Sequence, residues 1–259
     1  PDIGIVLNVG DTHLELLGSR ENIARAKGEL AEAIKPDGIV ILNADDEYTA
    51  AMAAKTNAKV ITFGIKKPAD IMAENIHMTD DNKTSFTCIL PDKEIKLSMP
   101  LIGEHNVYDA LAAVAAGYIM KMEPEQIKNG LERFEPSGMR FEISKMNNYT
   151  VVNDAYNASP LSMAAAIKSL SVMAGSRRIV VFGDMKELGK IEREAHEKIG
   201  VLCAQNKIDV LITLGPLAEY AADAAAENGM KHVYKCSTHA DIAVILNRIL
   251  TRVILFLPC

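Results

Sequence analysis

The first residues whose types could carry out chemistry follow an apolar run near the start of the chain. The stretch DIGIVLNVG (2–10) leads into a loop that holds Asp11, His13 and Glu15. In an open α/β sheet, ligands gather where strands end, so this loop is well placed for binding. A histidine beside carboxylates is usually structural or solvated. With a further ligand nearby, His13 becomes a candidate for holding Mg²⁺ as the partner of an anionic substrate.

A lysine on the next expected helix has an unusual position. The stretch GSRENIARAKGEL predicts a helix capped by Ser19, and at 100° per residue Lys27 lies within about 40° of Ile23, on the same side as Ile34. Two interpretations stay open. The stem can pack on the core while the ammonium reaches water. Alternatively, burial favours the neutral amine, which can bind CO₂ as a carbamate and so become a carboxylate-like metal ligand beside His13.

Polar residues also open the helix expected at 104–121. Val107 belongs to its apolar face, yet small residues such as Gly117 on the other faces indicate that it packs on several sides. Asn106 and Asp109 stand three residues apart in the first turn and face away from Val107. They can cap the helix and interact with its dipole, or they can hydrogen-bond a ligand that lies between domains.

A polar cluster ends the strand expected at 149–155 and precedes another helix. Ser159 and Pro160 are typical of the N-cap and the first position of a helix, so they need no further function. The residues just before them are not explained in this way: Asn153, Asp154, Tyr156 and Asn157. Ligand binding at the end of this strand therefore stays open.

The stretch RIVVFGDMKELG repeats this arrangement. A turn after the strand needs Gly183 but not the charges of Asp184, Lys186 and Glu187. GDMKELGK is not a phosphate-binding Walker loop, because five residues instead of four separate its glycines and Ile191 stands where Ser or Thr would hold Mg²⁺. The sequence also contains no GxSxG, HExxH or GxGxxG motif.

Composition excludes several classes of protein. The 259 residues carry a formal charge of -6, which argues against a general surface for nucleic acids or acidic membranes. No apolar run approaches the roughly 18 residues that span a bilayer, so no membrane insertion is expected. The four cysteines are far apart and form no CxxC pair, which favours neither a zinc site nor a disulfide framework. A reducing cytoplasm is the expected location.

An alternating α/β framework must position these residues. Strands are expected at 2–10, 38–46 and 58–65, and turn-rich sequence at 70–99 indicates antiparallel hairpins. Helices are expected near 104–121 and 124–133, and a linker around 134–142 places a domain boundary near residue 138. The second half predicts a Rossmann-like domain, with strands at 140–146, 149–155, 178–184, 209–215 and 231–234 and helices at 191–206, 216–228 and 239–250.

Six blocks of the sequence together resemble the ATP-dependent Mur ligases in order and spacing. They are NVGDTHLELLGSRENIARAKGEL, LNADD, GEHNVYDALAA, GMRFE, NDAYNASPLSM and VVFGDMKELG. The resemblance implies the latter part of the central ATP-binding domain at 1–138, a mainly parallel sheet with a β-hairpin portion, and a Rossmann-like C-terminal ligase domain at 139–259. The family's UDP-sugar domain and Walker loop are then expected upstream of Pro1.

The resemblance also implies an activity. In the family, ATP phosphorylates a peptide carboxylate to an acyl phosphate, which an amine attacks with release of phosphate. The last two blocks are most similar to members that add D-alanyl-D-alanine to UDP-N-acetylmuramoyl-tripeptide in peptidoglycan synthesis, with ATP and Mg²⁺ as cofactors. A monomer is expected. Because the C-terminal stretch TRVILFLPC lacks the family's Lys-Gly-Ser-Arg loop and the Walker loop is absent, the chain is not expected to catalyse ligation alone.

Two alternatives remain at this point. One is a related amide ligase with a different acceptor, either another Mur enzyme or a ligase similar to folylpolyglutamate synthase. The other is a folded binding module without catalysis.

The resemblance assigns roles to individual positions of the first part. Lys27 matches the carbamylated lysine of the family, and His13 matches the histidine that binds Mg²⁺. Asn106 and Asp109 fall at the helix start that contacts the nucleotide, although asparagine is common at the position of Asp109.

Four positions of the second part also match the family. Arg140 matches an arginine at the nucleotide and the interdomain hinge, and Asp154 matches an acidic residue near the ATP ribose or phosphates. Tyr156 and Asn157 fall on the substrate side.

Overall fold

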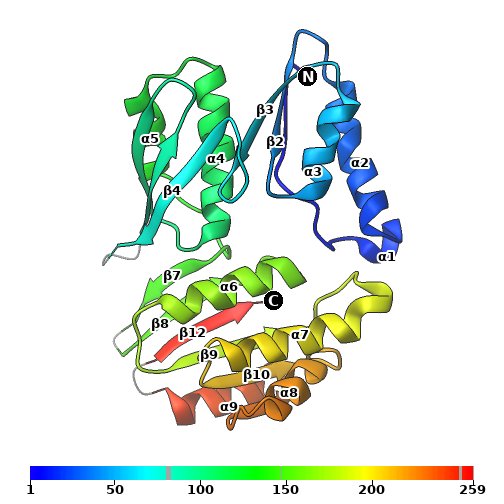
Figure 1. Ribbon diagram of the computed structural model, residues 1–259. Coiled ribbons are helices and arrows are strands. Elements are labelled where there is room, and N and C mark those ends of the chain that lie inside the picture. The colour runs from blue at the N-terminus through cyan, green and yellow to red at the C-terminus, as the bar shows by residue number, and fades with distance from the viewer. Residues whose placement is uncertain (80–82, 147, 251–252, 259) are drawn as a thin grey trace. The chain divides into compact units, whose positions relative to one another are not determined.

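The computed structural model describes residues 1–79, 83–146, 148–250 and 253–258 (Figure 1). Contacts divide the chain into two compact units. The first unit comprises residues 1–10 and 17–135, and the second comprises residues 11–16 and 136–259. Within the described ranges, no helix combines the length and apolar character that crossing a bilayer requires.

The first unit contains one six-stranded sheet in the order β1-β2-β3-β4-β5-β6. Its strands are β1 (Ile3–Val6), β2 (Ile39–Asn43), β3 (Lys59–Gly64), β4 (Ile71–Met78), β5 (Thr84–Ile89) and β6 (Glu94–Met99). The pairs from β1 to β4 are parallel, while β4, β5 and β6 are joined antiparallel. The expected parallel strands followed by hairpins are therefore confirmed.

The two helices expected near 104–121 and 124–133 are present close to those positions, together with further helices of this unit. They are α2 (Arg20–Ala33), α3 (Glu47–Ala51), the 3₁₀ helix η1 (Met52–Lys55), α4 (Glu104–Ile119) and α5 (Pro124–Glu132). The Ser19 hydroxyl accepts a hydrogen bond from the amide of Asn22, which confirms the predicted N-cap of α2. A short helix, α1 (Leu14–Leu17), was not expected.

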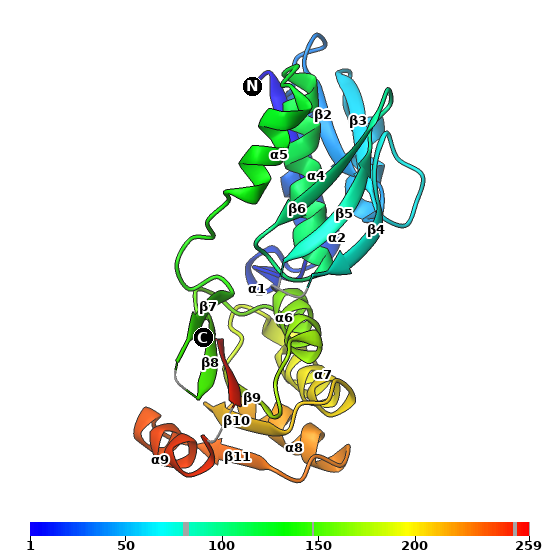
Figure 2. The same cartoon turned by 90° about the vertical axis from the view of Figure 1, so that its left-hand side faces the viewer.

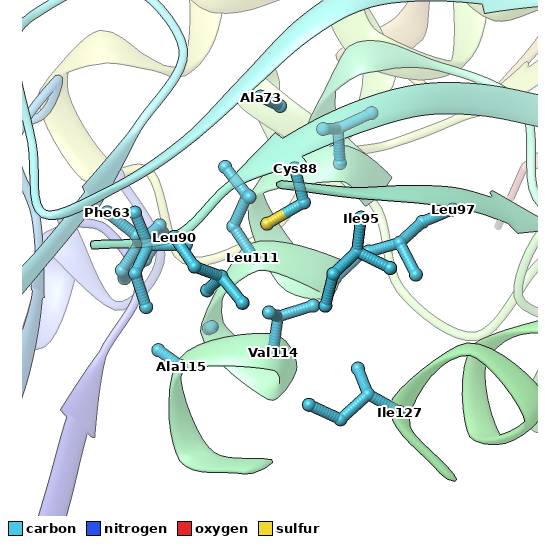
Figure 3. Close-up of a cluster of buried hydrophobic side chains, with 14 of the residues drawn as sticks. Phe63, Ala73, Cys88, Leu90, Ile95, Leu97, Leu111, Val114, Ala115 and Ile127 are labelled. Atoms are coloured by element: carbon cyan, nitrogen blue, oxygen red, sulfur yellow. The ribbon is translucent and has the colours of Figure 1, made fainter. Parts of the chain in front are cut away.

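Helix α4 supplies the centre of the core of the first unit. Figure 3 shows Leu111, Val114 and Ala115 of this helix among side chains of the sheet, such as Phe63 and Cys88. Leu111 and Phe63 are fully buried, and burying a side chain of this size stabilises the fold by about 1.5–3 kcal/mol. This packing fixes the first turn of α4 relative to the sheet.

The second unit contains a six-stranded sheet in the order β11-β10-β9-β12-β8-β7. Its strands are β7 (Glu142–Lys145), β8 (Tyr149–Asp154), β9 (Arg178–Gly183), β10 (Val210–Leu214), β11 (Val233–Cys236) and β12 (Val253–Pro258). β7 pairs antiparallel with β8, and the other neighbouring pairs are parallel. Strand β12 inserts between β8 and β9, so the sheet is completed by residues distant in sequence.

Helices lie on both faces of the second sheet, as the Rossmann-like prediction required. They are α6 (Pro160–Val172), the 3₁₀ helix η2 (Gly189–Ile191), α7 (Glu192–Gln205), α8 (Ala218–Glu227) and α9 (His239–Ile249). Ile242 of α9 packs in one cluster with Ile179 and Ile212 of the sheet. Figure 2 shows α9 beside β11, whereas α6 and α7 lie together on the other side of the strands.

Helices α7 and α8 approach each other very closely. A Cβ atom at Gly200 of α7 would lie 2.1 Å from the carbonyl oxygen of Ala221 in α8. Ala221 and its neighbours Ala222 and Ala225 are buried, so small side chains line the contact. Glycine at position 200 is therefore required by sterics rather than by backbone conformation.

Candidate functional site

The segment after β1 is held by side chains from neighbouring elements. The buried amide of Asn43 donates to the Leu7 carbonyl at 3.0 Å, and the Asp46 carboxylate accepts from the Val9 amide at 3.1 Å. The Arg20 guanidinium donates to the Val9 carbonyl at 2.9 Å. Backbone groups in a loop must find partners, and here charged and amide side chains satisfy them. The backbone from Leu7 to Val9, just before Gly10 and the loop that was expected to carry a site, is thus held by side chains.

Lys27 takes part in the same arrangement, and the structure agrees with the first of the two interpretations that the sequence left open. The residue is exposed, and its ammonium donates to the carbonyl of Asn8 at 2.9 Å. The buried positions of α2 are Ile23, Gly28 and Ala31. A long stem can follow the packed face of the helix while its charged end reaches the end of the strand and solvent. The carbamate at Lys27 stays a prediction.

His13 pairs with a residue far away in sequence. Its Nδ1 lies 2.5 Å from Oε2 of Glu187, and both residues belong to the second unit. An ionised carboxylate can only accept, so Nδ1 donates. The Glu187 carbonyl also accepts from the amide of Glu15 at 3.0 Å. The charge of Glu187, unexplained by the sequence, therefore serves to hold the segment that carries His13.

Both residues of this pair have unusual backbone conformations. His13 has a φ of 65° and Glu187 a φ of 62°, in the left-handed region that side-chain-bearing residues rarely occupy. Each such residue costs roughly 1–2 kcal/mol, so the surrounding contacts must stabilise it. The hydrogen bond between the two side chains is one of these contacts.

Asp184, another of the charged residues after β9, has a structural role. Oδ1 of Asp184 accepts from the amides of Leu217 and Ala218, at 3.0 and 2.7 Å, where α8 begins. A carboxylate at this place satisfies amides that lack a partner inside the helix and interacts favourably with its dipole. Asp184 therefore links the loop after β9 to the start of α8.

The buried side chain of His196 also holds the loop after β9 in place. The ring of His196 is fully buried against Phe182; its Nε2 accepts from the Met185 amide at 2.9 Å, and its Nδ1 donates to the Glu192 carbonyl at 2.6 Å. This pattern requires a neutral ring with its proton on Nδ1. His196 was not among the residues predicted from the sequence. The sequence signal that could have found His196 is its position about one turn after the start of a helix that follows a loop.

The start of α4 places Asn106 and Asp109 on one helix, as expected. The Asn106 amide donates to the Ile102 carbonyl at 2.9 Å and lies 3.1 Å from Nε2 of His105. Burial lowers the pKa of His105, which favours a neutral ring there. Asp109 lies at the surface of the helix. These contacts orient Asn106 without using all of its hydrogen-bonding atoms.

Asp45 of the first unit also has several partners, although the sequence analysis predicted no role for it. Oδ2 of Asp45 accepts from the amides of Ile65 and Lys66, its Oδ1 accepts from the Lys67 amide, and the Tyr108 hydroxyl donates to Oδ2 at 2.9 Å. Desolvation alone would raise the pKa of Asp45, but these donors outweigh it and lower the pKa. Asp45 thus joins the loop after β3 to the first turns of α4. It lies in the LNADD block, whose residues had no role predicted from the sequence.

Three of the predicted residues come together in the second unit. The Arg140 guanidinium lies 3.9 Å from the ring centroid of Tyr156. Oδ1 of Asp154 accepts from the Phe141 amide at 2.9 Å. Desolvation raises the pKa of Asp154, although this amide and the nearby charge of Arg140 act in the opposite direction. Asn157 is exposed beside them.

The predicted N-cap of α6 follows this cluster directly and is confirmed. The Ser159 hydroxyl accepts from the Ser162 amide, and Pro160 occupies the first turn.

The predicted metal ligands His13 and Lys27 come from different units of the chain. Among the described residues, no group of three or more His, Cys, Asp or Glu side chains could hold a metal ion. Lys27 belongs to the first unit, whereas the segment with His13 groups with the second. Asn106 and Asp109 likewise belong to the first unit, and Arg140 and Asp154 to the second.

One unit has a mixed sheet and the other a doubly wound sheet with polar residues at its strand ends, so the fold defines the class of two-domain α/β proteins. Family models narrow this class. Residues 1–117 match the Mur ligase middle domain, and residues 139–256 match the Mur ligase, glutamate ligase domain. The chain belongs to the Mur ligase family.

Individual relatives agree with the family models. The chain is 35% identical over 238 residues to UDP-N-acetylmuramoyl-tripeptide--D-alanyl-D-alanine ligase of Bacillus subtilis, a match that covers 91% of this chain and 50% of that protein. A crystal structure of MurF from Acinetobacter baumannii superposes with a TM-score of 0.89 at 28% identity, covering 100% of this chain and 56% of that one. The chain thus spans about half the length of the curated relatives it matches.

A more distant structure supports the fold. MurF ligase from Thermotoga maritima in complex with ADP superposes with a TM-score of 0.86 at 24% identity, covering 99% of this chain and 58% of that one.

Proposed function

We propose that this chain is part of an ATP-dependent ligase that joins D-alanyl-D-alanine to UDP-N-acetylmuramoyl-tripeptide. The observation that carries the proposal is the 35% identity to an enzyme of that name, which runs through both units and covers 91% of the chain. The NDAYNASP and GDMKELG blocks, where polar side chains follow strand ends, belong to the second unit of this chain. The reaction would form an amide bond and release one phosphate for each ATP used.

Nucleotide binding is assigned to both units. Asn106 and Asp109 would hydrogen-bond the base, since an amide and a carboxylate supply both donors and acceptors. Arg140 would pair with phosphate oxygens, because a guanidinium matches their geometry. Asp154 would accept from a ribose hydroxyl. The complex of the Thermotoga maritima ligase with ADP is in keeping with this assignment.

The metal proposed for this enzyme is Mg²⁺, with His13 and Lys27 as the residues of this chain that would hold it. The donor chemistry fits in part. With Nδ1 of His13 bonded to Glu187, the other ring nitrogen is the one left to bind a ligand. Lys27 offers an oxygen donor only as a carbamate. When bound, Mg²⁺ would neutralise charge on the phosphates during transfer.

The peptide carboxylate and the incoming amine are the reacting groups of the proposed ligase. Phosphorylation of the carboxylate by ATP forms an acyl phosphate, the amine of D-alanyl-D-alanine attacks its carbonyl carbon, and phosphate leaves. Tyr156 and Asn157 would face the peptide substrates in this scheme. We further propose a monomeric protein in the cytoplasm, in keeping with the free, buried Cys88, Cys203 and Cys236.

An acceptor panel tests the specific assignment. The full-length gene product is incubated with ATP, Mg²⁺ and UDP-N-acetylmuramoyl-tripeptide, and with D-alanyl-D-alanine, D-glutamate, L-alanine or L-lysine as the acceptor. Mass spectrometry of the nucleotide-sugar product should show addition of D-alanyl-D-alanine alone. Preferred addition of another amino acid would instead assign a different ligase of the family. In a parallel incubation with a folate and L-glutamate in place of the UDP-sugar and the acceptor, addition of glutamate to the folate would indicate an enzyme similar to folylpolyglutamate synthase.

A further inference from the structure

Three contacts hold the chain around Arg140 from both sides. The Phe141 amide donates to Oδ1 of Asp154 at 2.9 Å, and the Tyr156 amide donates to the Met139 carbonyl at 3.0 Å. The Arg140 guanidinium itself lies 3.9 Å from the Tyr156 ring centroid. The residue before Arg140, the residue after it and its side chain are therefore each bound to the 154–156 segment.

These contacts maintain an unusual backbone. Met139 has a φ of 59° and Phe141 a φ of 49°, so two non-glycine residues in the left-handed region flank Arg140. Such conformations are strained and persist only where the surroundings determine them. The hydrogen bonds of Phe141 to the Asp154 carboxylate and of Met139 to the Tyr156 amide explain how these two backbone conformations are maintained.

The ring of Tyr156 is placed where packing does not require it. Tyr156 is 59% exposed, and Arg140 is exposed as well. An exposed arginine normally samples many rotamers and loses conformational entropy when it is fixed. Stacking on an aromatic face offsets part of this cost and leaves the N–H groups at the edge of the guanidinium free to bind an anion.

We propose that Tyr156 is a positioning residue for Arg140, and that the stacked pair binds a phosphate group of the nucleotide through the guanidinium edge. This inference rests on the proposed function and deepens it. It gives Tyr156 a role through Arg140, whereas the family resemblance placed it on the substrate side. Asp154 contributes through the backbone as well, by fixing the residue after Arg140.

The first test concerns the position of the side chain and needs no ligand. In the 259-residue chain, the ring current of Tyr156 should shift the Arg140 Nε–H and Hδ NMR signals upfield. Tyr156→Phe should keep this shift and Tyr156→Leu should abolish it. Tyr220→Leu is the matched control, because Arg193 lies 5.0 Å from the Tyr220 ring centroid elsewhere in the same unit. Signals of Arg140 that are the same in the Leu variant and the unmodified protein would overturn the proposal.

The second test is a double-mutant cycle on the full-length gene product. Calorimetry gives the Kd for ADP, and kinetics give KM for ATP and for each peptide substrate. Tyr156→Leu should weaken ADP binding about 3- to 10-fold, as expected for loss of a cation–π contact, while Tyr156→Phe changes it less than about 2-fold. In an Arg140→Ala background, Tyr156→Leu should have no further effect.

The outcomes separate this inference from the proposed function. If Tyr156→Leu weakens ADP binding equally with and without Arg140, or raises KM only for a peptide substrate, the positioning role is wrong. Absence of ADP binding by the unmodified protein would also overturn it. Coupled effects on ADP binding in a protein that does not ligate D-alanyl-D-alanine would support this inference and contradict the proposed function. Melting temperatures verify that all variants fold. Because Tyr156 is exposed, its substitutions should leave the melting temperature unchanged.

Discussion

The imidazole of His13 donates through Nδ1 to the carboxylate of Glu187, although 174 residues separate the two in the chain. The bond selects one ring orientation and one position for the proton. The same relationship, a carboxylate behind a histidine, is widely used in proteins to orient a histidine whose other nitrogen binds a metal.

Glu187→Gln should weaken this selection. A neutral amide is a poorer acceptor than a carboxylate, so the neutral His13 ring should shift from the Nδ1–H form towards the Nε2–H form. ¹⁵N chemical shifts of the two ring nitrogens of His13 report the two forms. Glu194→Gln, which alters an exposed glutamate paired with Lys198, is the control and should change nothing. Equal tautomer populations in the unmodified protein and the Gln variant would contradict this account.

Asp45→Asn should destabilise the first unit by about 2 kcal/mol. The Asp45 carboxylate accepts hydrogen bonds from three amides and a hydroxyl. In asparagine one carboxylate oxygen is replaced by an NH₂ group, which would face these donors and cannot accept from them. Urea denaturation followed by circular dichroism measures the change. Asp92→Asn, at an exposed ion pair with Lys93, is the control and should change stability by less than about 0.5 kcal/mol. Similar losses for the two variants would show that Asp45 has no special role.

The effect of Asp45 should also depend on pH in one direction. Because its pKa is lowered in the folded state, the stability it contributes is fully present above the unfolded pKa, near 3.8, and is lost as pH falls through the lower folded value. The stability difference between the unmodified protein and Asp45→Asn should be constant above about pH 5 and should shrink below about pH 4. A difference that grows on acidification would contradict the assigned cause.

His196→Ala should destabilise the second unit by about 2–4 kcal/mol. The change leaves the Met185 amide without its acceptor and opens a cavity beside Phe182. Because the Met185 amide lies in the loop that carries Glu187, hydrogen exchange there should also become faster. His232→Ala, at an exposed histidine, should have no such effect on either measurement. Unchanged exchange in the 184–188 loop of the His196 variant would show that the ring does not hold this loop.

Two glycine substitutions should act in opposite directions. Gly200→Ala places a Cβ 2.1 Å from a backbone oxygen of the facing helix, so α7 and α8 must move apart and about 3 kcal/mol should be lost. Gly130→Ala meets nothing within 4 Å inside α5 and should stabilise that helix by about 0.5–1 kcal/mol. Denaturant midpoints distinguish the two, and a neutral Gly200→Ala would show that the helices can separate at little cost.

Local signals in the sequence predicted most of the fold. The caps at Ser19 and Ser159 and the periodicity of α4 lie within a few residues, so they can be read without knowing what packs around them. The place of β12 between β8 and β9 depends on pairing across about 100 residues and has no local signal.

The candidate site was harder to predict for the same reason. Helix geometry placed Lys27 on the apolar side and left open whether its ammonium is buried or reaches water, and the partner of the ammonium, the Asn8 carbonyl, emerged only from the structure. The partners of Glu187 and Asp45 come from distant parts of the chain, so no local pattern could assign their roles. Asp154 and Tyr156 stood out in the sequence as polar residues at the end of a strand, and Arg140 was found through the family resemblance. The contacts among the three emerged from the structure.

Release of phosphate by the full-length gene product tests the central claim most directly. In the presence of ATP and Mg²⁺, phosphate should be released only when UDP-N-acetylmuramoyl-tripeptide and D-alanyl-D-alanine are both supplied, with one phosphate for each amide bond formed. Release that does not depend on D-alanyl-D-alanine, or no release with both substrates present, would contradict the assignment.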